Sequence, residues 1–333
     1  MSRYLLTGAT GFLGRHLLSV LQGAGHEVVA LCRKQPFDLA NSASLSIKLG
    51  DVLDRESVLA AASGCEGLFH CAGRVSRRPE DADALFRVHV EGTKITLDAA
   101  RESGIKRVVL ASTSGTIAVS RNAKLLAETA PSPQDILKGW PYYRSKLYAE
   151  KAALDRNGPG FEVISVNPSL LLGPGDVLGS STGDVVSFLE GRVPMIPAGG
   201  LSFVDARDAA VTMLAAMEKG RAGERYLLGA KNLTFAEFFD MLERISGVKG
   251  PRIKAPKSLL LAQAGAEIME RVAKRMKTEA AVDRISAEMG QHFWYIDAKK
   301  AIAELGFAPR DATETVSDTI ADLQARGVVW PRA

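Results

Sequence analysis

The stretch TGATGFLG (residues 7–14) places three glycines directly after the apolar run RYLLT (3–7) and at the start of the helical pattern FLGRHLLSVLQGAG. Gly8 permits a tight turn, Gly11 lets the backbone approach a pyrophosphate, and Gly14 lets the helix pack closely on the strand. The helix N-terminus then presents free N–H groups to a phosphate. A structural glycine turn is the plain alternative, but strand, loop and helix in this order favour dinucleotide binding.

Short apolar runs alternate with helical patterns through the first half of the chain. This alternation predicts βαβ units with right-handed crossovers. We therefore expect an α/β fold built on a Rossmann-type, doubly wound parallel sheet. The expected strands are 3–7, 26–32, 45–51, 67–73, 106–113 and 161–167, and the expected long helices are 12–25, 83–104 and 141–155.

The second half of the chain is less regular, because prolines and glycines interrupt its pattern. A strand that runs into a helix is expected over 201–210, and a further strand over 224–229. We expect an NAD(P)-binding Rossmann domain over 1–166, completed by about 201–229. The remaining segments, 167–200 and 230–333, are expected to form a smaller, mostly helical substrate-binding region.

The composition is that of an ordinary soluble globular protein, with 46% hydrophobic and 24% charged residues. A net charge of +4 permits an anionic ligand but does not point to nucleic acid, which would need a clustered basic face. The three cysteines, Cys32, Cys65 and Cys71, match no zinc pattern, so no metal site is expected. The opening residues do not resemble a signal peptide and no apolar run is long enough for a transmembrane segment, so we expect a cytoplasmic protein.

Several further motifs make the resemblance to one family specific. In chain order they are TGATGFLG, GD (50–51), HCAG (70–73), ASTSG (111–115), Tyr142-x-x-x-Lys146, NPSLLLGPGD (167–176) and FVDARDAA (203–210). They resemble the motifs of the extended short-chain dehydrogenases/reductases, the NAD-dependent epimerase/dehydratase family. Within it the chain is most similar to the dihydroflavonol-reductase-like and 3β-hydroxysteroid-dehydrogenase-like reductases. The resemblance implies an NAD(P)-dependent enzyme that acts on a CH–OH or C=O group.

Two adjacent tyrosines raise the question of which one is catalytic. Tyr142 precedes Lys146 by four residues, so both lie on one helical face, and the ammonium favours the phenolate. By the resemblance, Lys146 also holds the nicotinamide ribose. Tyr143 points about 100° away around the helix. Tyr295 and Lys299 have the same spacing but are better interpreted as packing and solvated charge. We expect Tyr142 to be the catalytic acid/base.

The third catalytic group is expected at the end of the fifth strand, in Ser112, Thr113 and Ser114. The resemblance places it at Thr113, whose hydroxyl would stabilise negative charge on the substrate oxygen. Ser114 is the main rival, and capping or turning the chain is the structural alternative. His89 stands where the family often has asparagine. A structural role, a proton-relay role and an ordinary buried histidine all stay open for it.

The resemblance also implies a set of ligand contacts in the loops that follow the strands. The expected cofactor contacts are Gly8, Thr10, Gly11, Phe12, Leu13, Gly14, Arg33, Lys34, Asp51, Val52, Cys71, Ala72, Gly73, Tyr142, Lys146, Asn167, Pro168 and Ser169. Ser114 and Leu170 are expected substrate contacts.

The second strand indicates which nucleotide is used. An NAD site normally ends this strand with an acidic residue that binds the adenosine ribose. Here the position is Cys32, and Arg33 and Lys34 follow at once. A guanidinium can pair with a 2′-phosphate, whereas a carboxylate would repel it. A solvated basic loop is the alternative. The sequence predicts NADP(H), with NAD(H) as the second choice.

Together these features predict an NADP(H)-dependent oxidoreductase that reduces a ketone or aldehyde, or oxidises the corresponding secondary alcohol. Tyr142 would transfer the proton, Lys146 would tune it and Thr113 would hold the oxygen. A nucleotide-sugar epimerase or dehydratase that keeps NAD bound is the alternative. A dinucleotide-sensing scaffold without turnover is a third possibility, but it would not need the Tyr-Lys pair.

Two further expectations concern surfaces. Helices 83–104 and 140–155 carry more apolar positions than one face against a sheet requires. In the family such helices pair across a dimer axis, so we expect a homodimer. The apolar-to-basic helix 258–276 is expected to pack in the core with a solvated basic face, and covering a pocket or lying on a membrane surface are the alternatives.

Overall fold

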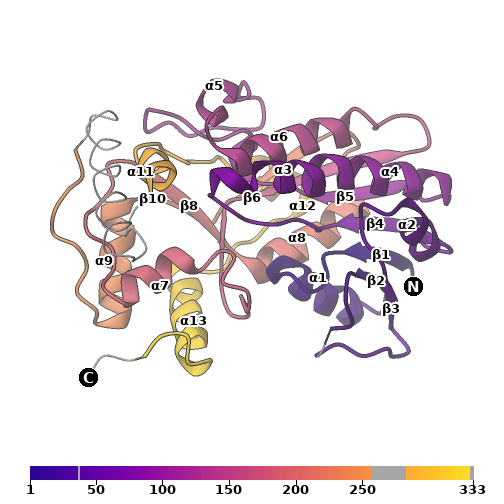
Figure 1. Ribbon diagram of the computed structural model, residues 1–333, viewed down its shortest axis with the longest axis horizontal. Helices are drawn as coiled ribbons and strands as arrows, with labels where there is room; N and C mark the ends of the chain where they lie inside the picture. The colour runs from indigo at the N-terminus through magenta and orange to yellow at the C-terminus, as the bar shows by residue number, and fades with distance from the viewer. Residues whose placement is uncertain (37, 257–282, 331–333) are drawn as a thin grey trace.

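The computed structural model describes residues 1–36, 38–256 and 283–330, so the expected helix 258–276 lies outside the described residues. One large parallel sheet dominates it (Figure 1). Its strands are β1 (Arg3–Thr7), β2 (Glu27–Cys32), β3 (Leu45–Leu49), β4 (Gly67–His70), β5 (Arg107–Ala111), β6 (Glu162–Pro168) and β9 (Arg225–Leu228). Their order, β3-β2-β1-β4-β5-β6-β9, is doubly wound, and the predicted Rossmann fold is confirmed.

Helices cover both faces of this sheet (Figure 1). Leu5 and Leu6 show the consequence, because they point to opposite faces of β1 and both are fully buried. Strands buried on both sides read as continuous apolar runs, which is why the sequence pattern identified them. One face carries α1 (Phe12–Gly23), α8 (Ala206–Lys219) and α12 (Lys299–Leu305), and the other carries α2 (Arg55–Ala62), α4 (Gly92–Glu102) and α6 (Pro141–Leu154).

The expected helix over 83–104 is present but is not uniform. It consists of α3 (Ala82–Phe86), a π-helical turn over Arg87–Glu91 and α4. A short 3-10 turn, Pro79–Asp81, precedes it. The expected strand over 67–73 ends at His70, so residues 71–73 leave the sheet and are free to form a loop beside the glycine turn. Both departures lie at the end of the sheet that carries the predicted site.

A second, three-stranded sheet accompanies the large one, and the sequence predicted only its central strand, within 201–210. Its order is β10-β8-β7, with β8 antiparallel to β10 and parallel to β7. A separate core of phenylalanines and aliphatic residues forms around it. The elements of this part are β7 (Leu170–Leu172), α7 (Gly183–Leu189), β8 (Gly200–Asp205), β10 (Lys231–Thr234), α9 (Phe235–Ser246), α11 (Arg284–Met289) and α13 (Ala312–Ala325), and α5 (Gln134–Leu137) is a short helix before α6.

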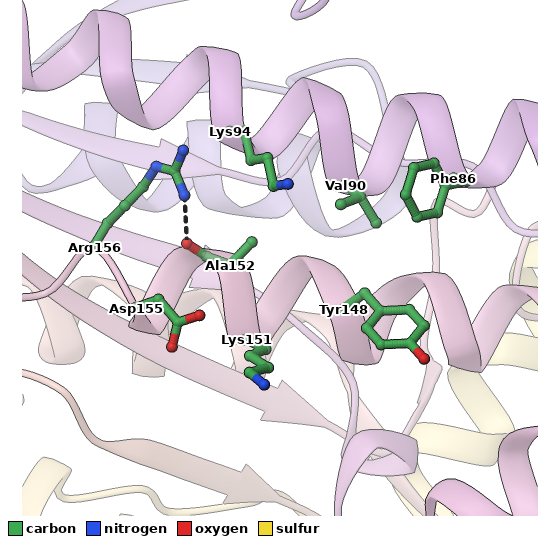
Figure 2. Close-up of a pocket in the computed structure, with 8 residues that line it drawn as sticks. All are labelled: Phe86, Val90, Lys94, Tyr148, Lys151, Ala152, Asp155 and Arg156. Carbon is green, nitrogen blue, oxygen red and sulfur yellow. Dashed lines mark hydrogen bonds between the residues drawn. The ribbon is translucent and has the colours of Figure 1, made fainter.

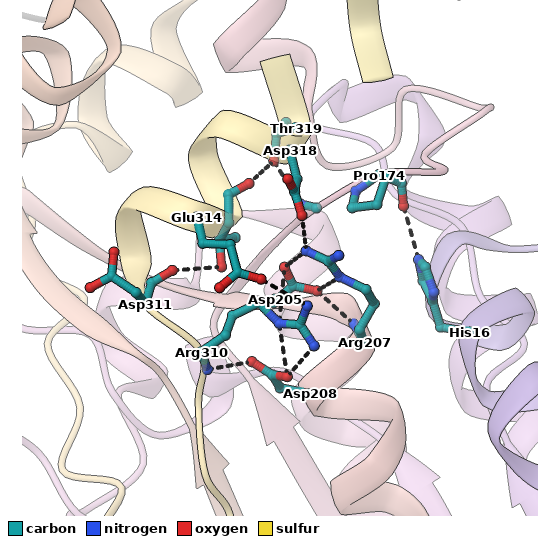
Figure 3. A network of polar contacts seen from close by, with 12 residues as sticks. His16, Pro174, Asp205, Arg207, Asp208, Arg310, Asp311, Glu314, Asp318 and Thr319 are labelled. Atoms are coloured by element: carbon teal, nitrogen blue, oxygen red, sulfur yellow. Dashed lines mark hydrogen bonds and ion pairs between the residues drawn. The ribbon is translucent and has the colours of Figure 1, made fainter. Parts of the chain in front are cut away.

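A buried ionic network joins the two parts where β8 leads into α8 (Figure 3). Asp205 is fully buried, and its carboxylate accepts hydrogen bonds from the backbone N–H of Arg207 at 2.9 Å and from its guanidinium at 2.7 Å. The Arg207 guanidinium also donates to Asp318 of α13 at 2.7 Å. Arg310, just before α13, pairs with Asp208 at 2.8 Å and lies 3.6 Å from Asp205. The network therefore fastens the C-terminal helix to the first turn of α8.

We predict that Asp205→Ala lowers the free energy of unfolding by about 3–5 kcal/mol, because it removes the fully buried carboxylate that binds Arg207 and lies 3.6 Å from Arg310. Burial opposes ionisation of Asp205, but the hydrogen bonds and positive charge of Arg207 outweigh it and lower the pKa of this carboxyl. Its contribution should therefore be present above about pH 3.9 and be lost as the pH falls through the lowered value. Urea unfolding at several pH values measures both effects.

Asp318→Ala is the matched control, because Asp318 binds the same guanidinium but is 38% exposed. Asp318→Ala should lower the free energy of unfolding by about 0–1 kcal/mol. Equal losses in the two variants would contradict the buried role of Asp205.

Candidate functional site

The glycine turn is packed so tightly that no larger residue fits at positions 8 and 14. Gly8 has a φ of 75°, and a Cβ placed on it would lie 2.5 Å from the carbonyl oxygen of Cys71. A Cβ on Gly14 would collide with the carbonyl oxygen of Gly8. The Gly11 N–H donates to that same oxygen at 3.0 Å. The turn is thus pressed between the end of β4 and the start of α1, as the spacing of the glycines predicts.

Helix α1 begins in a way that leaves its N-terminus free for an anion. Its N-cap is Gly11, which supplies no side-chain cap, and its first turn contains no acidic residue. The first N–H groups of a helix have no partner within it and carry a partial positive charge. Phe12 and Leu13 are buried, so this end of α1 exposes mainly its backbone. This turn fits a dinucleotide pyrophosphate.

The loop after β4 is fixed next to the glycine turn. The Cys71 N–H donates to the Thr7 carbonyl at 3.1 Å, and the Ala72 N–H donates to the Thr7 hydroxyl at 3.2 Å. A Cβ on Gly73 would approach His89 Nε2 to 3.2 Å. Burial raises the pKa of the Cys71 thiol to about 12, so this cysteine is not an activated nucleophile. These hydrogen bonds therefore hold the backbone of residues 71–73 beside the glycine turn.

Basic side chains gather at the end of β2. Cys32 is buried, whereas Arg33 and Lys34 are exposed, and neither forms an ion pair within the described part of the chain. Arg15 of α1 donates to the Thr10 carbonyl at 3.1 Å and pairs with Asp38, a residue of the loop that follows Arg33. After β3, Val52 is buried and Asp51 accepts the Leu53 N–H at 3.0 Å. Sequence analysis had not considered Arg15.

Helix α6 brings Tyr142 and Lys146 to the end of β5. It begins with Pro141, which is favoured at the first helical position because its missing N–H is not needed there. Lys146 is 8% exposed, and its amine donates to the carbonyl of Ala111 at 2.7 Å. Burial lowers the pKa of Lys146 to about 8, although the Glu150 charge opposes the shift.

Tyr142 is half-buried, and its pKa moves away from neutrality. Burial raises the pKa of Tyr142 above its ordinary value, and the neighbouring Tyr143 adds to the rise. The spacing suggested a shift in the other direction, but the Lys146 amine is directed to a backbone carbonyl and burial dominates. Near neutral pH the phenol is protonated, which suits a proton donor.

Glu150 lies one helical turn beyond Lys146 and was missed by the sequence analysis. Its carboxylate is 2% exposed, and Arg225 lies 3.6 Å from it. One of its oxygens accepts hydrogen bonds from four side chains, two that follow β5 and two in β6. They are Ser112, Thr116, Ser165 and Asn167. The extended pattern Tyr-x-x-x-Lys-x-x-x-Glu puts all three residues on one helical face, so spacing by four was the available signal.

The hydroxyl of Thr113 lies at the start of a 3-10 turn, Ser114–Thr116, and accepts the Gly115 N–H at 3.3 Å. The capping role is thus observed, and the hydroxyl proton remains available to a ligand. The Asn167 amide donates to the Thr113 carbonyl at 3.1 Å. Asn167 is fully buried, so its side chain holds the strand ends together. Ser114 is also buried.

The segment after β6 leads from this site into the smaller part. Pro168 ends β6, and the Ser169 N–H donates to the Leu228 carbonyl at 2.8 Å. The Ser169 hydroxyl is buried and has no hydrogen-bond partner among the described residues. Leu170 begins β7 and is partly buried.

Aromatic side chains from distant segments surround Tyr143. Its ring lies 4.9 Å from those of Tyr142 and Trp294, and Trp140 stacks on Trp294 at 5.5 Å. Burial raises the pKa of Tyr143 to about 12, while the positive charge of Arg77 opposes this rise. Tyr143 is therefore part of an aromatic wall beside Tyr142.

An ion pair links the loop after β4 to the smaller part. The Arg77 guanidinium binds Asp184 of α7 through two hydrogen bonds, of 2.7 and 3.0 Å. The same guanidinium lies 3.4 Å from the Ser286 hydroxyl of α11. The charges of Arg77 and Asp184 also act on the pKa of Tyr143, so this link lies near the aromatic side chains beside Tyr142.

Comparison with known proteins defines the class to which this fold and site belong. The model of the NAD dependent epimerase/dehydratase family matches residues 4–229, so the chain belongs to this family, the extended short-chain dehydrogenases/reductases. The predicted family is confirmed, and with it an NAD(P)-dependent oxidoreductase.

Individual relatives agree with this assignment. The chain is 32% identical to the Synechocystis sp. protein named "Putative dihydroflavonol 4-reductase", over 98% of this chain and 96% of that protein. It is 34% identical to cinnamoyl-CoA reductase 1 of Oryza sativa subsp. japonica, over 72% of this chain and 75% of that enzyme. The crystal structure of gox2253 superposes with a TM-score of 0.84 at 30% identity and covers 99% of this chain and 100% of its own.

Two further findings on the described residues concern membrane-spanning helices and metal sites. Over those ranges, no helix combines the length and the apolar character needed to cross a bilayer. Within the same ranges, no group of three or more His, Cys, Asp or Glu side chains is placed to hold a metal ion.

We predict that Glu150→Gln lowers the pKa of Lys146 below about 8, because it removes the negative charge that opposes the effect of burial. The side-chain carbon signals of labelled lysine, followed by NMR from pH 6 to 11, report this value. Lys146→Arg identifies the signal by its loss.

Glu162→Gln is the control, because this carboxylate of β6 is 45% exposed and pairs with Arg107 instead. The Lys146 titration should be unchanged in it. A Lys146 pKa that stays the same or rises in Glu150→Gln would contradict the electrostatic role of Glu150.

Proposed function

We propose that the protein is an NADP(H)-dependent reductase of a ketone or aldehyde, or oxidises the corresponding secondary alcohol. The observation that carries this proposal is the placement of Tyr142 and Lys146 on one face of α6, with the Lys146 amine bound to the Ala111 carbonyl at the end of β5. Reductases among the relatives support the same direction. The segments 167–200 and 230–333 would supply the substrate side, and residues 1–166 with about 201–229 the nucleotide side.

The proposed chemistry divides among residues of this chain. A bound nicotinamide cofactor supplies or accepts the hydride. The Tyr142 hydroxyl donates its proton to the carbonyl oxygen of the substrate, and the Thr113 hydroxyl holds that oxygen by a hydrogen bond. Lys146, whose pKa is about 8, remains mostly protonated near pH 7 and stabilises the tyrosinate that is left.

We predict that Tyr142→Phe lowers turnover by roughly 100-fold or more while fold and nucleotide affinity stay nearly intact, because only the proton donor is removed. A screen of carbonyl compounds against loss of NADPH absorbance supplies the assay. Tyr143→Phe is the matched control, since its hydroxyl is buried on the same turn. Equal losses in two folded variants would refute the assignment to Tyr142.

We infer NADP(H) from the basic end of β2, where Cys32 replaces an acidic residue and Arg33 and Lys34 are exposed. Arg33→Ala should lower the preference for NADPH over NADH by about ten- to hundredfold in kcat/KM, the value of one charge-assisted hydrogen bond or a little more. Lys48→Ala, which removes an exposed charge from β3, is the control. A wild type that prefers NADH, or an unchanged ratio in Arg33→Ala, would show that Arg33 does not bind the 2′-phosphate.

A nucleotide-sugar epimerase or dehydratase remains the second candidate, since the matching family model bears that name. Such an enzyme would keep NAD bound through purification. Identification of the nucleotide released on denaturation separates the two, because tightly held NAD would favour the epimerase or dehydratase and release of NADP or of no nucleotide the reductase.

We propose a homodimer that pairs α4 and α6 of two subunits. A groove of about 600 Å³ runs between α3–α4 and α6 (Figure 2). Phe86 and Tyr148 line it and are 42% and 46% exposed, which is unusual for large side chains on a helix surface. The remaining lining residues are Val90, Lys94, Lys151, Ala152, Asp155 and Arg156.

Phe86→Asp should shift the protein toward the monomer, because it replaces an exposed apolar ring of the proposed interface with a charge. Sedimentation at micromolar concentration measures the change. Leu178→Asp, at a position that is 74% exposed on another surface, should leave the dimer intact. A wild type that sediments only as monomer would refute the proposal.

A further inference from the structure

His89 occupies an unusual place in the helix before β5. It lies in the π-helical turn Arg87–Glu91 and is 2% exposed. Its ring meets the ring of Tyr142 edge-on at 5.7 Å. π-helical turns inside α-helices are rare and often occur at functional sites. The turn thus places an imidazole between the loop after β4 and the first turn of α6.

Both ring nitrogens of His89 are engaged, and the direction of the hydrogen bonds is fixed. The Arg74 backbone N–H donates to Nε2 at 3.1 Å, so Nε2 carries no proton. A neutral ring then has its proton on Nδ1, which donates to the Ser145 hydroxyl at 2.8 Å. The Ser145 hydroxyl in turn donates to the Tyr142 carbonyl at 2.8 Å.

This chain of hydrogen bonds ends on a backbone carbonyl. It does not pass through the Tyr142 hydroxyl, and the Lys146 amine has its own acceptor, the Ala111 carbonyl. Burial lowers the pKa of His89 to about 3, so the neutral ring persists through the working range of pH. These hydrogen bonds fix the first turn of α6 relative to the loop after β4. They offer no route for a proton from the solvent to the Tyr142 phenol.

We propose that His89 is a positioning residue that couples the cofactor-side loop at Gly73–Arg74 to the first turn of α6, and so sets the place of Tyr142 relative to the bound nucleotide. The inference rests on the proposed reductase function. This coupling needs a side chain with a hydrogen-bond acceptor at one end and a donor at the other. The imidazole supplies both on one rigid ring. A Cβ on Gly73 would come within 3.2 Å of the same nitrogen, so glycine leaves room for the ring beside this loop.

Two substitutions separate the two hydrogen bonds. In His89→Gln the side-chain amide reaches the place of Nε2 and can still accept from Arg74, but the donor to Ser145 is lost. In His89→Asn the shorter amide replaces Nδ1 and can still donate to Ser145, but the acceptor for Arg74 is lost. Ser145→Ala removes the next link toward Tyr142.

The expected results differ between the variants. His89→Gln and Ser145→Ala should each lower kcat roughly tenfold with little change in the Kd for NADPH, because the first turn of α6 shifts. The double variant should be no worse than either single one. His89→Asn should weaken NADPH binding about fivefold, with kcat at saturating nucleotide close to that of the wild type. The pKa of the kcat profile should be the same in all folded variants.

The control is His26→Gln, because His26 also accepts a backbone N–H, that of Ser2 at 3.2 Å, but lies before β2 at the opposite end of the sheet. It should leave kcat and Kd unchanged. A kcat profile whose pKa shifts in both His89 variants would overturn the proposal in favour of a proton relay. If His89→Gln and His89→Asn lowered kcat equally and weakened NADPH binding equally, the two hydrogen bonds would not have separate roles.

The Kd measurement keeps this inference distinct from the proposed function. Quenching of tryptophan fluorescence by NADPH needs no turnover, and Trp140 and Trp294 lie near Tyr142 through Tyr143. If the wild type reduced no carbonyl compound, the proposed function would fail. Weaker NADPH binding in His89→Asn but not in His89→Gln would still support the loop contact, and equal binding in both would overturn it.

Discussion

The Glu150 carboxylate is the constraint on which the site geometry depends. It lies under α6, between the ends of β5 and β6, where an isolated charge would cost several kcal/mol to bury. Hydroxyl and amide donors from both strands, with Arg225 nearby, offset that cost. Helix α6 therefore has one favourable position on the sheet. Because Tyr142 and Lys146 lie on the same helical face as Glu150, their positions follow from it.

Burial then determines the protonation of the two groups. It raises the pKa of Tyr142 and lowers that of Lys146 to about 8, since both charged forms lose solvation. The pair therefore starts as a neutral phenol and a mostly charged amine on the same face of α6. This state favours donation of a proton to a substrate oxygen, with the lysine charge ready for the tyrosinate that forms. The position of α6 therefore sets the burial of both groups, and the burial sets the protonation states that the proposed reduction needs.

Sequence patterns predicted the large sheet because its signal is local. RYLLT, EVVALC and RVVLA are each continuous apolar runs, and the glycine turn needs only eight consecutive residues. The Tyr142–Lys146 pair is also local, lying within one helical turn. These features required no knowledge of which distant segments come together.

The features that were missed depend on distant partners. Arg77 and Asp184 are 107 residues apart, and Trp294 returns to Tyr143 from near the end of the chain. Strands β7 and β10 have only three and four residues, too few to show an alternating pattern. Glu150 could have been found by extending the spacing of four, but its donors on β5 and β6 become visible only in the fold.

A crystal structure with NADPH bound tests the central claim most directly, because the account places the nucleotide before any substrate is known. It predicts the pyrophosphate on the N–H groups at the start of α1, the 2′-phosphate beside Arg33, and the nicotinamide ribose within hydrogen-bonding distance of Lys146. The reactive ring carbon should face a space bounded by the Tyr142 and Thr113 hydroxyls. A nicotinamide ring that lies away from both hydroxyls, or against Tyr143 instead, would contradict it.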